Sequence, residues 1–120
     1  MNFSSDNVAG AHEAVLRAVV TANANPVAAY GDDALSAEAD KALQNLFEKE
    51  CAVFFVTTGT AANALALSAF CPPWGAVYCH VDAHILNDEN TAVELFSGGA
   101  RLVGIAGHAG KPDPVSLQEA

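Results

Sequence analysis

The run Thr58-Gly59-Thr60-Ala61-Ala62-Asn63 decides how this chain folds, because it joins two segments of different hydrophobic pattern. Before it lies the apolar run 51–57, which predicts a strand that is buried on both faces. After it, residues 60–70 have the apolar spacing of a helix. A strand that turns directly into a helix points unpaired backbone N–H groups and the positive end of the helix dipole at one place, which suits a phosphate.

Strand and helix patterns alternate on both sides of this turn. We expect strands at 76–81 and 102–106, with a short helix between them at 88–96. Upstream, apolar spacing predicts a helix at 11–23 and a second helix that begins at Ser36 as its N-cap and ends near residue 50. Strands without polar alternation that are separated by helices are typical of an α/β fold with a mostly parallel sheet flanked by helices.

The domain organisation follows from the same pattern. We expect an N-terminal arm, helix and loop in residues 1–34 and one incomplete α/β domain in residues 35–120. Asp113-Pro114 predicts a helix that begins at 114, which leaves only about a turn and a half before Ala120. Three parallel strands would also leave sheet edges and apolar faces open. We therefore expect the chain to be the front section of a longer polypeptide.

Charge and composition narrow the classes of partner. The chain has 14 acidic and 5 basic side chains, a net charge of −9, which repels nucleic acid and acidic membrane lipids. No stretch approaches the roughly 18 apolar residues of a membrane span, and residues 1–6 do not resemble a targeting signal. The three cysteines, Cys51, Cys71 and Cys79, form no closely spaced pair. We expect reduced, mostly buried thiols in a cytoplasmic protein that binds a small molecule.

The turn at 57–63 has two interpretations. The N–H groups of Gly59 and Thr60 and the hydroxyls of Thr58 and Thr60 would hold a cofactor phosphate, with a glycine that lets the ligand approach the backbone. Alternatively, the turn is an ordinary polar connection with Thr60 as the helix N-cap. The run lacks the lysine of a P-loop and the glycine spacing of a dinucleotide-binding turn, so spacing alone leaves both interpretations open.

A second candidate, His80-Val81-Asp82-Ala83-His84, follows the next strand. Open α/β sheets bind ligands outside the carboxyl ends of their strands, where His84 would stack on an aromatic cofactor and exchange protons. An extended segment would instead place His80, Asp82 and His84 on one side, as a metal site requires. Residues 83–86 look like a loop that enters a helix, which weakens the metal interpretation. A histidine bonded to a strand-end carbonyl is the third possibility.

Three smaller candidates complete the set. The Ser5 hydroxyl in Ser5-Asp6 would hold a substrate carboxylate, although such a run is commonly a simple turn. Asp88-Glu89 most simply places negative charge on the first turn of the helix expected at 88–96. His108 lies in a glycine-rich loop and receives no role.

Four motifs together resemble a known family. They fall in the order and spacing of the N-terminal part of the pyridoxal-phosphate-dependent threonine aldolases, of the low-specificity or phenylserine type, which are grouped with the aromatic amino acid β-eliminating lyases. The resemblance covers essentially the whole chain. The motifs are Phe3-Ser4-Ser5-Asp6-Asn7, Ala29-Tyr30-Gly31-Asp32-Asp33, Phe55-Val56-Thr57-Thr58-Gly59-Thr60-Ala61-Ala62-Asn63 and Asp82-Ala83-His84.

The resemblance implies a fold-type-I large domain that works as a homodimer or homotetramer. It implies that Thr58, Gly59 and Thr60 bind the phosphate of pyridoxal 5′-phosphate, and that His84 stacks on the pyridine ring and assists proton transfer. It also implies that Ser5 contacts the substrate carboxylate. Tyr30 would lie in the loop that reaches the active site near the subunit interface.

The implied reaction cleaves a β-hydroxy-α-amino acid, such as L-threonine or phenylserine, to glycine and an aldehyde. The family's Schiff-base lysine lies further along than residue 120. Lys41 and Lys49 fall on the outer side of a helix and Lys111 in a proline-flanked loop, so none suits that role and we expect the chain alone to be inactive. A non-catalytic interaction module and a metal-dependent hydrolase that uses His80, Asp82 and His84 remain as alternatives.

Overall fold

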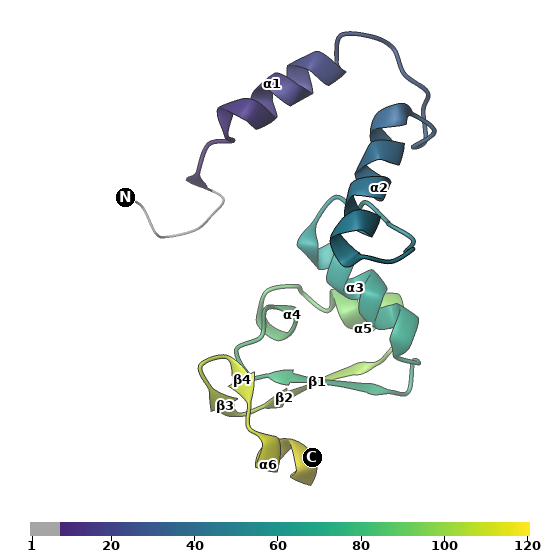
Figure 1. The fold of residues 1–120 in the computed structure, drawn as a ribbon. Coiled ribbons are helices and arrows are strands. Elements are labelled where there is room, and N and C mark those ends of the chain that lie inside the picture. The colour runs from purple at the N-terminus through teal and green to yellow at the C-terminus, as the bar shows by residue number, and fades with distance from the viewer. Residues whose placement is uncertain (1–7) are drawn as a thin grey trace. The chain divides into compact units, whose positions relative to one another are not determined.

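Residues 8–120, which a computed structural model describes, belong to two compact units (Figure 1). The first unit ends at Val53 and the second runs from Phe54 to Ala120. None of the helices in the described residues is long and apolar enough to cross a membrane. The predicted division of the chain into residues 1–34 and 35–120 stays a prediction.

The first unit contains helices α1 (Glu13–Ala22) and α2 (Ala34–Phe47), neither of which holds a buried residue. The predicted N-cap of the second helix, Ser36, is wrong. Asp33 caps α2, since its carboxylate accepts hydrogen bonds from the N–H groups of Leu35 at 2.9 Å and Ser36 at 3.0 Å. The Ser36 hydroxyl donates to the same carboxylate at 2.7 Å, and these bonds, led by that of the hydroxyl, lower the pKa of Asp33. A carboxylate serves here because it accepts several hydrogen bonds at once.

The second unit is built around a parallel pair of strands. Its elements are α3 (Gly59–Phe70), β1 (Ala76–His80), α4 (His84–Asn87), α5 (Ala92–Ser97), β2 (Arg101–Ile105), β3 (Gly107–His108), β4 (Lys111–Pro112) and α6 (Pro114–Glu119). In the β1–β2 pair, Ala76 lies opposite Arg101 and His80 opposite Ile105, whereas β3 and β4 form a short antiparallel hairpin. Figure 1 shows α3, α4 and α5 on one side of the β1–β2 pair and α6 on the other. The expected helices at 60–70 and from 114, and the expected strands at 76–81 and 102–106, are confirmed to within about a residue.

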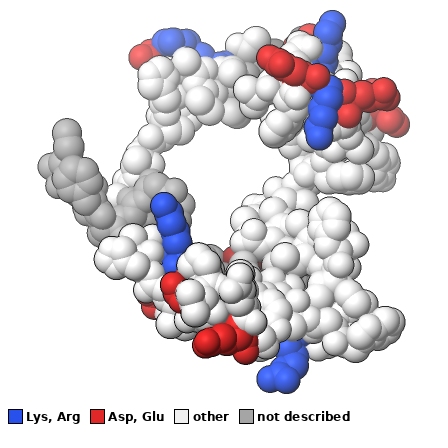
Figure 2. All heavy atoms as spheres, turned by 60° about the horizontal axis from the view of Figure 1, so that its bottom comes forward, with Lys and Arg blue, Asp and Glu red and all other residues white. Residues whose placement is uncertain are grey.

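The core of the second unit is small. Its buried apolar residues are Ala64, Cys79, Val93, Ala100 and Ile105. Large apolar side chains stay exposed, among them Phe54 at 85%, Phe70 at 89% and Trp74 at 87%. Figure 2 shows the charged groups in a few clusters, some with acidic and basic groups side by side, and wide uncharged areas between the clusters. Two strands offer too little surface to bury so many apolar groups.

The cysteines are free thiols, as expected, but only Cys79 is buried. Burial raises the pKa of the Cys79 thiol, because the thiolate would lose its solvation. Cys51 and Cys71 are half-buried. The expectation of mostly buried thiols is therefore wrong for two of the three.

Two predicted elements differ from the structure. Residues 51–57 form no strand, because a strand exists only where its backbone pairs with another, and no described residue pairs with this run. The helix expected at 88–96 begins later than predicted, since α4 ends at Asn87 and α5 runs from Ala92 to Ser97. Between them Asn90 and Thr91 have left-handed backbone angles, with φ of 47° and 63°, which interrupt a right-handed helix.

Gly107 yields a test of the β3–β4 hairpin. A Cβ at this position would overlap the backbone carbonyl of Lys111. We expect Gly107→Ala to open the hairpin at a cost of about 1–3 kcal/mol, the range for overpacked sites, and to speed amide hydrogen exchange in β3 and β4. Gly10→Ala is the matched control, because a Cβ there meets nothing within 4 Å. An unchanged exchange pattern in the Gly107 variant would contradict this packing.

Candidate functional site

Helix α3 begins with a turn that leaves two backbone N–H groups unpaired. Thr58 is its N-cap, and the Thr58 hydroxyl accepts a hydrogen bond from the N–H of Ala61 at 3.0 Å. The Thr58 carbonyl accepts one from the N–H of Ala62 at 3.1 Å. The N–H groups of Gly59 and Thr60 have no hydrogen-bond partner among residues 8–120. These two donors lie at the positive end of the helix dipole, an arrangement that attracts anions. The interpretation with Thr60 as the N-cap is wrong, because Thr58 fills that place.

Gly59 is not required by the packing of the described residues. A Cβ added at Gly59 would meet nothing within 4 Å, and its backbone lies outside the left-handed region that favours glycine. Neither neighbours nor backbone angles therefore explain the missing side chain. Its effect is to leave the first N–H groups of α3 open to a ligand.

One carboxylate joins this turn to His84. Oε1 of Glu89 accepts a hydrogen bond from Nδ2 of Asn63 at 2.7 Å and lies 2.8 Å from Nδ1 of His84. Asn63 stands four residues after Gly59, so both lie on the same face of α3. The structure thus links the two segments that the sequence places at one crevice. The third interpretation of His84 is wrong, because the hydrogen-bond partner of its ring is this carboxylate and not a strand-end carbonyl.

Glu89 is buried while its partner His84 faces solvent. Glu89 is 4% exposed, whereas the side chain of His84 is 68% exposed. Burial raises the pKa of Glu89, but the hydrogen bonds from Asn63 and His84, together with the charge of His84, outweigh burial and lower the pKa overall. The other carboxylate oxygen, Oε2, is buried and has no hydrogen-bond partner in the structure. Glu89 is therefore an ionised acceptor at neutral pH.

Sequence reasoning missed this role of Glu89. It placed Asp88-Glu89 on the first turn of a helix, whereas Glu89 lies in the turn between α4 and α5. The partners of Glu89 are 5 and 26 residues away, so no periodicity marks it. The surrounding residues 87–91 are all polar, so the sequence gives no signal that Glu89 is buried.

Residues 80–84 do not form the metal site that an extended segment would give. His80 is buried, and its Nδ1 accepts a hydrogen bond from the N–H of Asp82 at 3.1 Å, whereas the side chain of Asp82 is 85% exposed. The chain enters α4 at His84, which ends the extended geometry that the triad needs. Within residues 8–120, no group of three or more His, Cys, Asp or Glu side chains could hold a metal ion.

The remaining candidates lie elsewhere. Ser5 falls outside the described residues. Tyr30 lies in the first unit, where its side chain is fully exposed and its φ is 64°. Left-handed backbone angles are uncommon for a residue with a large side chain, and they occur in turns as well as at functional sites. The role of Tyr30 stays a prediction. His108 is exposed on β3 and contributes nothing to the site.

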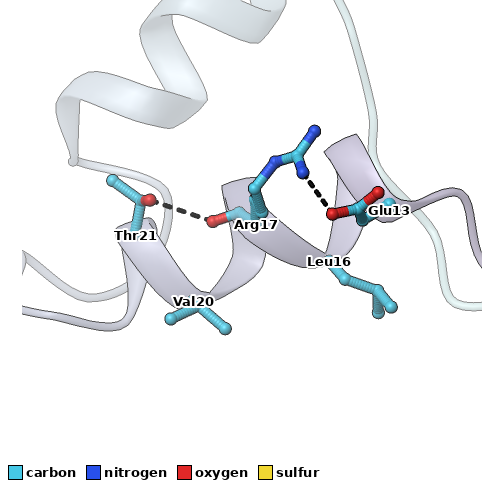
Figure 3. A pocket seen from close by; sticks show the side chains of 5 residues that line it. All are labelled: Glu13, Leu16, Arg17, Val20 and Thr21. Atoms are coloured by element: carbon cyan, nitrogen blue, oxygen red, sulfur yellow. Dashed lines mark hydrogen bonds and ion pairs between the residues drawn. The ribbon is translucent and has the colours of Figure 1, made fainter.

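A hollow on the first unit is not part of this site (Figure 3). All its lining residues come from α1, namely Glu13, Leu16, Arg17, Val20 and Thr21. Arg17 pairs with Glu13, and the Thr21 hydroxyl donates to the Arg17 carbonyl at 2.9 Å. Its charged groups are thus paired within one helix, so we assign it no function.

Asn63 gives a test of the electrostatics at Glu89. The hydrogen bond from Asn63 lowers the pKa of Glu89, so we expect Asn63→Ala to raise it. A lowered pKa stabilises the fold above the unfolded value of about 4.3, and this stabilisation is lost as pH falls through the folded value. The variant should therefore lose part of this stabilisation. Carboxyl ¹³C NMR titration measures the pKa, with Asn45→Ala on exposed α2 as the control. An unshifted Glu89 titration would contradict the bond.

Comparison with known proteins agrees with the four sequence motifs. The model of the beta-eliminating lyase family matches residues 2–120. Low specificity L-threonine aldolases of Pseudomonas sp. and Pseudomonas aeruginosa are 42% and 41% identical to this chain over 117 residues, which is 98% of the chain. The match covers 34% of each relative, so the chain spans about a third of their length. The chain belongs to the beta-eliminating lyase family.

Proposed function

We propose that this chain forms the phosphate-binding part of a pyridoxal-phosphate-dependent enzyme that cleaves β-hydroxy-α-amino acids, such as L-threonine or phenylserine, to glycine and an aldehyde. The relatives that match it are named low specificity L-threonine aldolases. The observation that carries the proposal is the open turn of α3. The N–H groups of Gly59 and Thr60 are unpaired within residues 8–120, and they belong to a helix that is hydrogen-bonded through Glu89 to a solvent-facing imidazole.

The chemistry of this turn fits a phosphate. The N–H groups of Gly59 and Thr60 would donate to phosphate oxygens, and the absent side chain at Gly59 gives them room. The Thr58 hydroxyl accepts from Ala61 and still has its own hydrogen to donate. The Thr60 hydroxyl, at the first turn of α3, would be a further donor. Because these donors are backbone and hydroxyl groups, the chain would bind an anion despite its acidic composition.

His84 would contribute through its ring. Its exposed face would stack on the pyridine ring, and the ring nitrogen that does not face Glu89 would hold or move a proton. When bound, pyridoxal phosphate supplies an electron sink for the bond that breaks. Glu89 and Asn63 hold the imidazole and the phosphate turn in one connected arrangement. Ser5 and Tyr30 are the proposed contacts of the substrate.

Turnover would need a lysine that this chain does not supply. Lys41, Lys49 and Lys111 are all exposed. A lysine that forms a Schiff base works as a neutral amine, which requires desolvation or a neighbouring charge. We infer that the chain alone binds the cofactor weakly and does not turn over substrate, and that the complete enzyme is a cytoplasmic homodimer or homotetramer.

Gly59→Asp tests the phosphate turn. We expect the N–H signals of Gly59 and Thr60 to shift when the unmodified chain is titrated with pyridoxal 5′-phosphate in an NMR experiment. The variant should bind at least about tenfold more weakly, because its carboxylate repels the phosphate at close range. Helix α3 should persist, since a Cβ at this site meets nothing within 4 Å and negative charge suits a helix N-terminus.

Two controls sharpen this test. Gly59→Asn has nearly the same size without the charge and should bind more tightly than Gly59→Asp. Borohydride reduction should label the unmodified chain and Gly59→Asp to the same extent, because the exposed lysines react with the aldehyde independently of the start of α3. Equal binding by Gly59→Asp and the unmodified chain, or no binding by the unmodified chain, would overturn the proposed function.

A further inference from the structure

We propose that Glu89 is a positioning residue that fixes which nitrogen of His84 carries the proton. The inference rests on the proposed function for its significance, but its geometry belongs to the second unit itself. Oε1 of Glu89 lies 2.8 Å from Nδ1 of His84. An ionised carboxylate only accepts hydrogen bonds, so Nδ1 must be the donor. A neutral imidazole has one N–H, which leaves Nε2 as an acceptor.

The carboxylate is itself held in place. Glu89 is 4% exposed, and its Oε1 accepts a second hydrogen bond from Asn63 at 2.7 Å. Its Oε2 has no hydrogen-bond partner in the structure, so Asn63 and His84 are its hydrogen-bond donors within residues 8–120. A buried charge with so few donors gains much from each, because an unmatched buried charge is costly. The imidazole is therefore bound to a fixed acceptor.

The backbone that carries His84 is fixed by other contacts. Nδ2 of Asn87, at the end of α4, donates to the carbonyls of Val81 at 2.8 Å and Ala83 at 3.0 Å. Leu86 of the same helix packs against β2 at Gly104, where an added Cβ would lie 3.0 Å from its Cδ2. The backbone of His84 is thus anchored, and its ring is hydrogen-bonded to a buried acceptor. This leaves its Nε2 edge free to meet a ligand.

The arrangement gives His84 a defined direction of proton transfer. Nε2 accepts a proton from a bound group, while Nδ1 keeps its own proton and its hydrogen bond to Glu89. The imidazolium that results still donates from Nδ1 to Glu89. Because Asn63 and Gly59 share one face of α3, the same carboxylate also sets the position of the imidazole relative to the phosphate turn.

The test is the tautomer of His84 in the ¹⁵N-labelled chain. Long-range ¹H–¹⁵N NMR correlations of the neutral imidazole identify which nitrogen is protonated. We expect the Nδ1–H form of His84 to exceed the Nε2–H form by at least about tenfold, as a hydrogen bond to a charged group provides. Glu89→Gln should lose this preference, because the introduced amide both donates and accepts. Asp82→Asn is the control, since Asp82 neighbours His80 and makes no hydrogen bond to His84.

The unmodified chain keeps the test decisive even where Glu89→Gln fails to fold. An Nε2–H tautomer of His84 in the unmodified chain would overturn the inference by itself, as would an unchanged preference in a folded Glu89→Gln variant. The outcome is separate from that of the proposed function. If pyridoxal 5′-phosphate shifts the N–H signals of Gly59 and Thr60 but His84 is in the Nε2–H form, only this inference is overturned. If His84 is in the Nδ1–H form, Glu89→Gln abolishes that preference and the chain binds no pyridoxal 5′-phosphate, this inference is supported and the proposed function is overturned.

Discussion

One buried oxygen atom, Oε1 of Glu89, holds the candidate site together. It accepts hydrogen bonds from α3 through Asn63 and from α4 through His84, two segments that are far apart in the sequence. Burying a carboxylate without donors would cost several kcal/mol or force it to take up a proton. The two donors prevent this, since together they lower the pKa of Glu89 despite its burial. The contact that keeps the acid ionised is therefore the contact that orients the imidazole.

The parallel strands determine where these groups meet. Helix α3 precedes β1, and the carboxyl end of β1 leads through a short turn to His84 at the start of α4. The crossover from β1 to β2 contains α4, Glu89 and α5, so the acid lies between the strands in sequence and next to α3 in space. Gly104 on β2 lets Leu86 approach closely, which draws α4 onto the sheet. The ligand-binding position expected outside the strand ends of an open α/β sheet is occupied here by this network.

Local chemistry could be predicted from the sequence where it depends on neighbouring residues. Helix α6 follows from Asp113-Pro114, and the helical spacing of 60–70 predicts α3. The strand expected at 51–57 failed because an apolar run shows that a segment is buried or extended, but not that another strand pairs with it. Glu89 could not be assigned to Asn63 and His84, because one of these contacts spans 26 residues. The open turn of α3 was predictable because its N–H groups depend only on the helix start.

Phosphate binding and Schiff-base formation differ in the same way, because the first depends on neighbouring residues and the second on the packing of many side chains. Binding a phosphate at a helix start would require only backbone donors, and α3 begins with two N–H groups that are unpaired within residues 8–120, next to an exposed Gly59. A Schiff-base lysine requires a site of low polarity, which only many packed side chains create. The second unit buries five apolar residues and leaves Phe54, Phe70 and Trp74 in solvent. We therefore propose that the second unit orients an anion and an imidazole, and that its small core gives no interior where an amine would lose its proton.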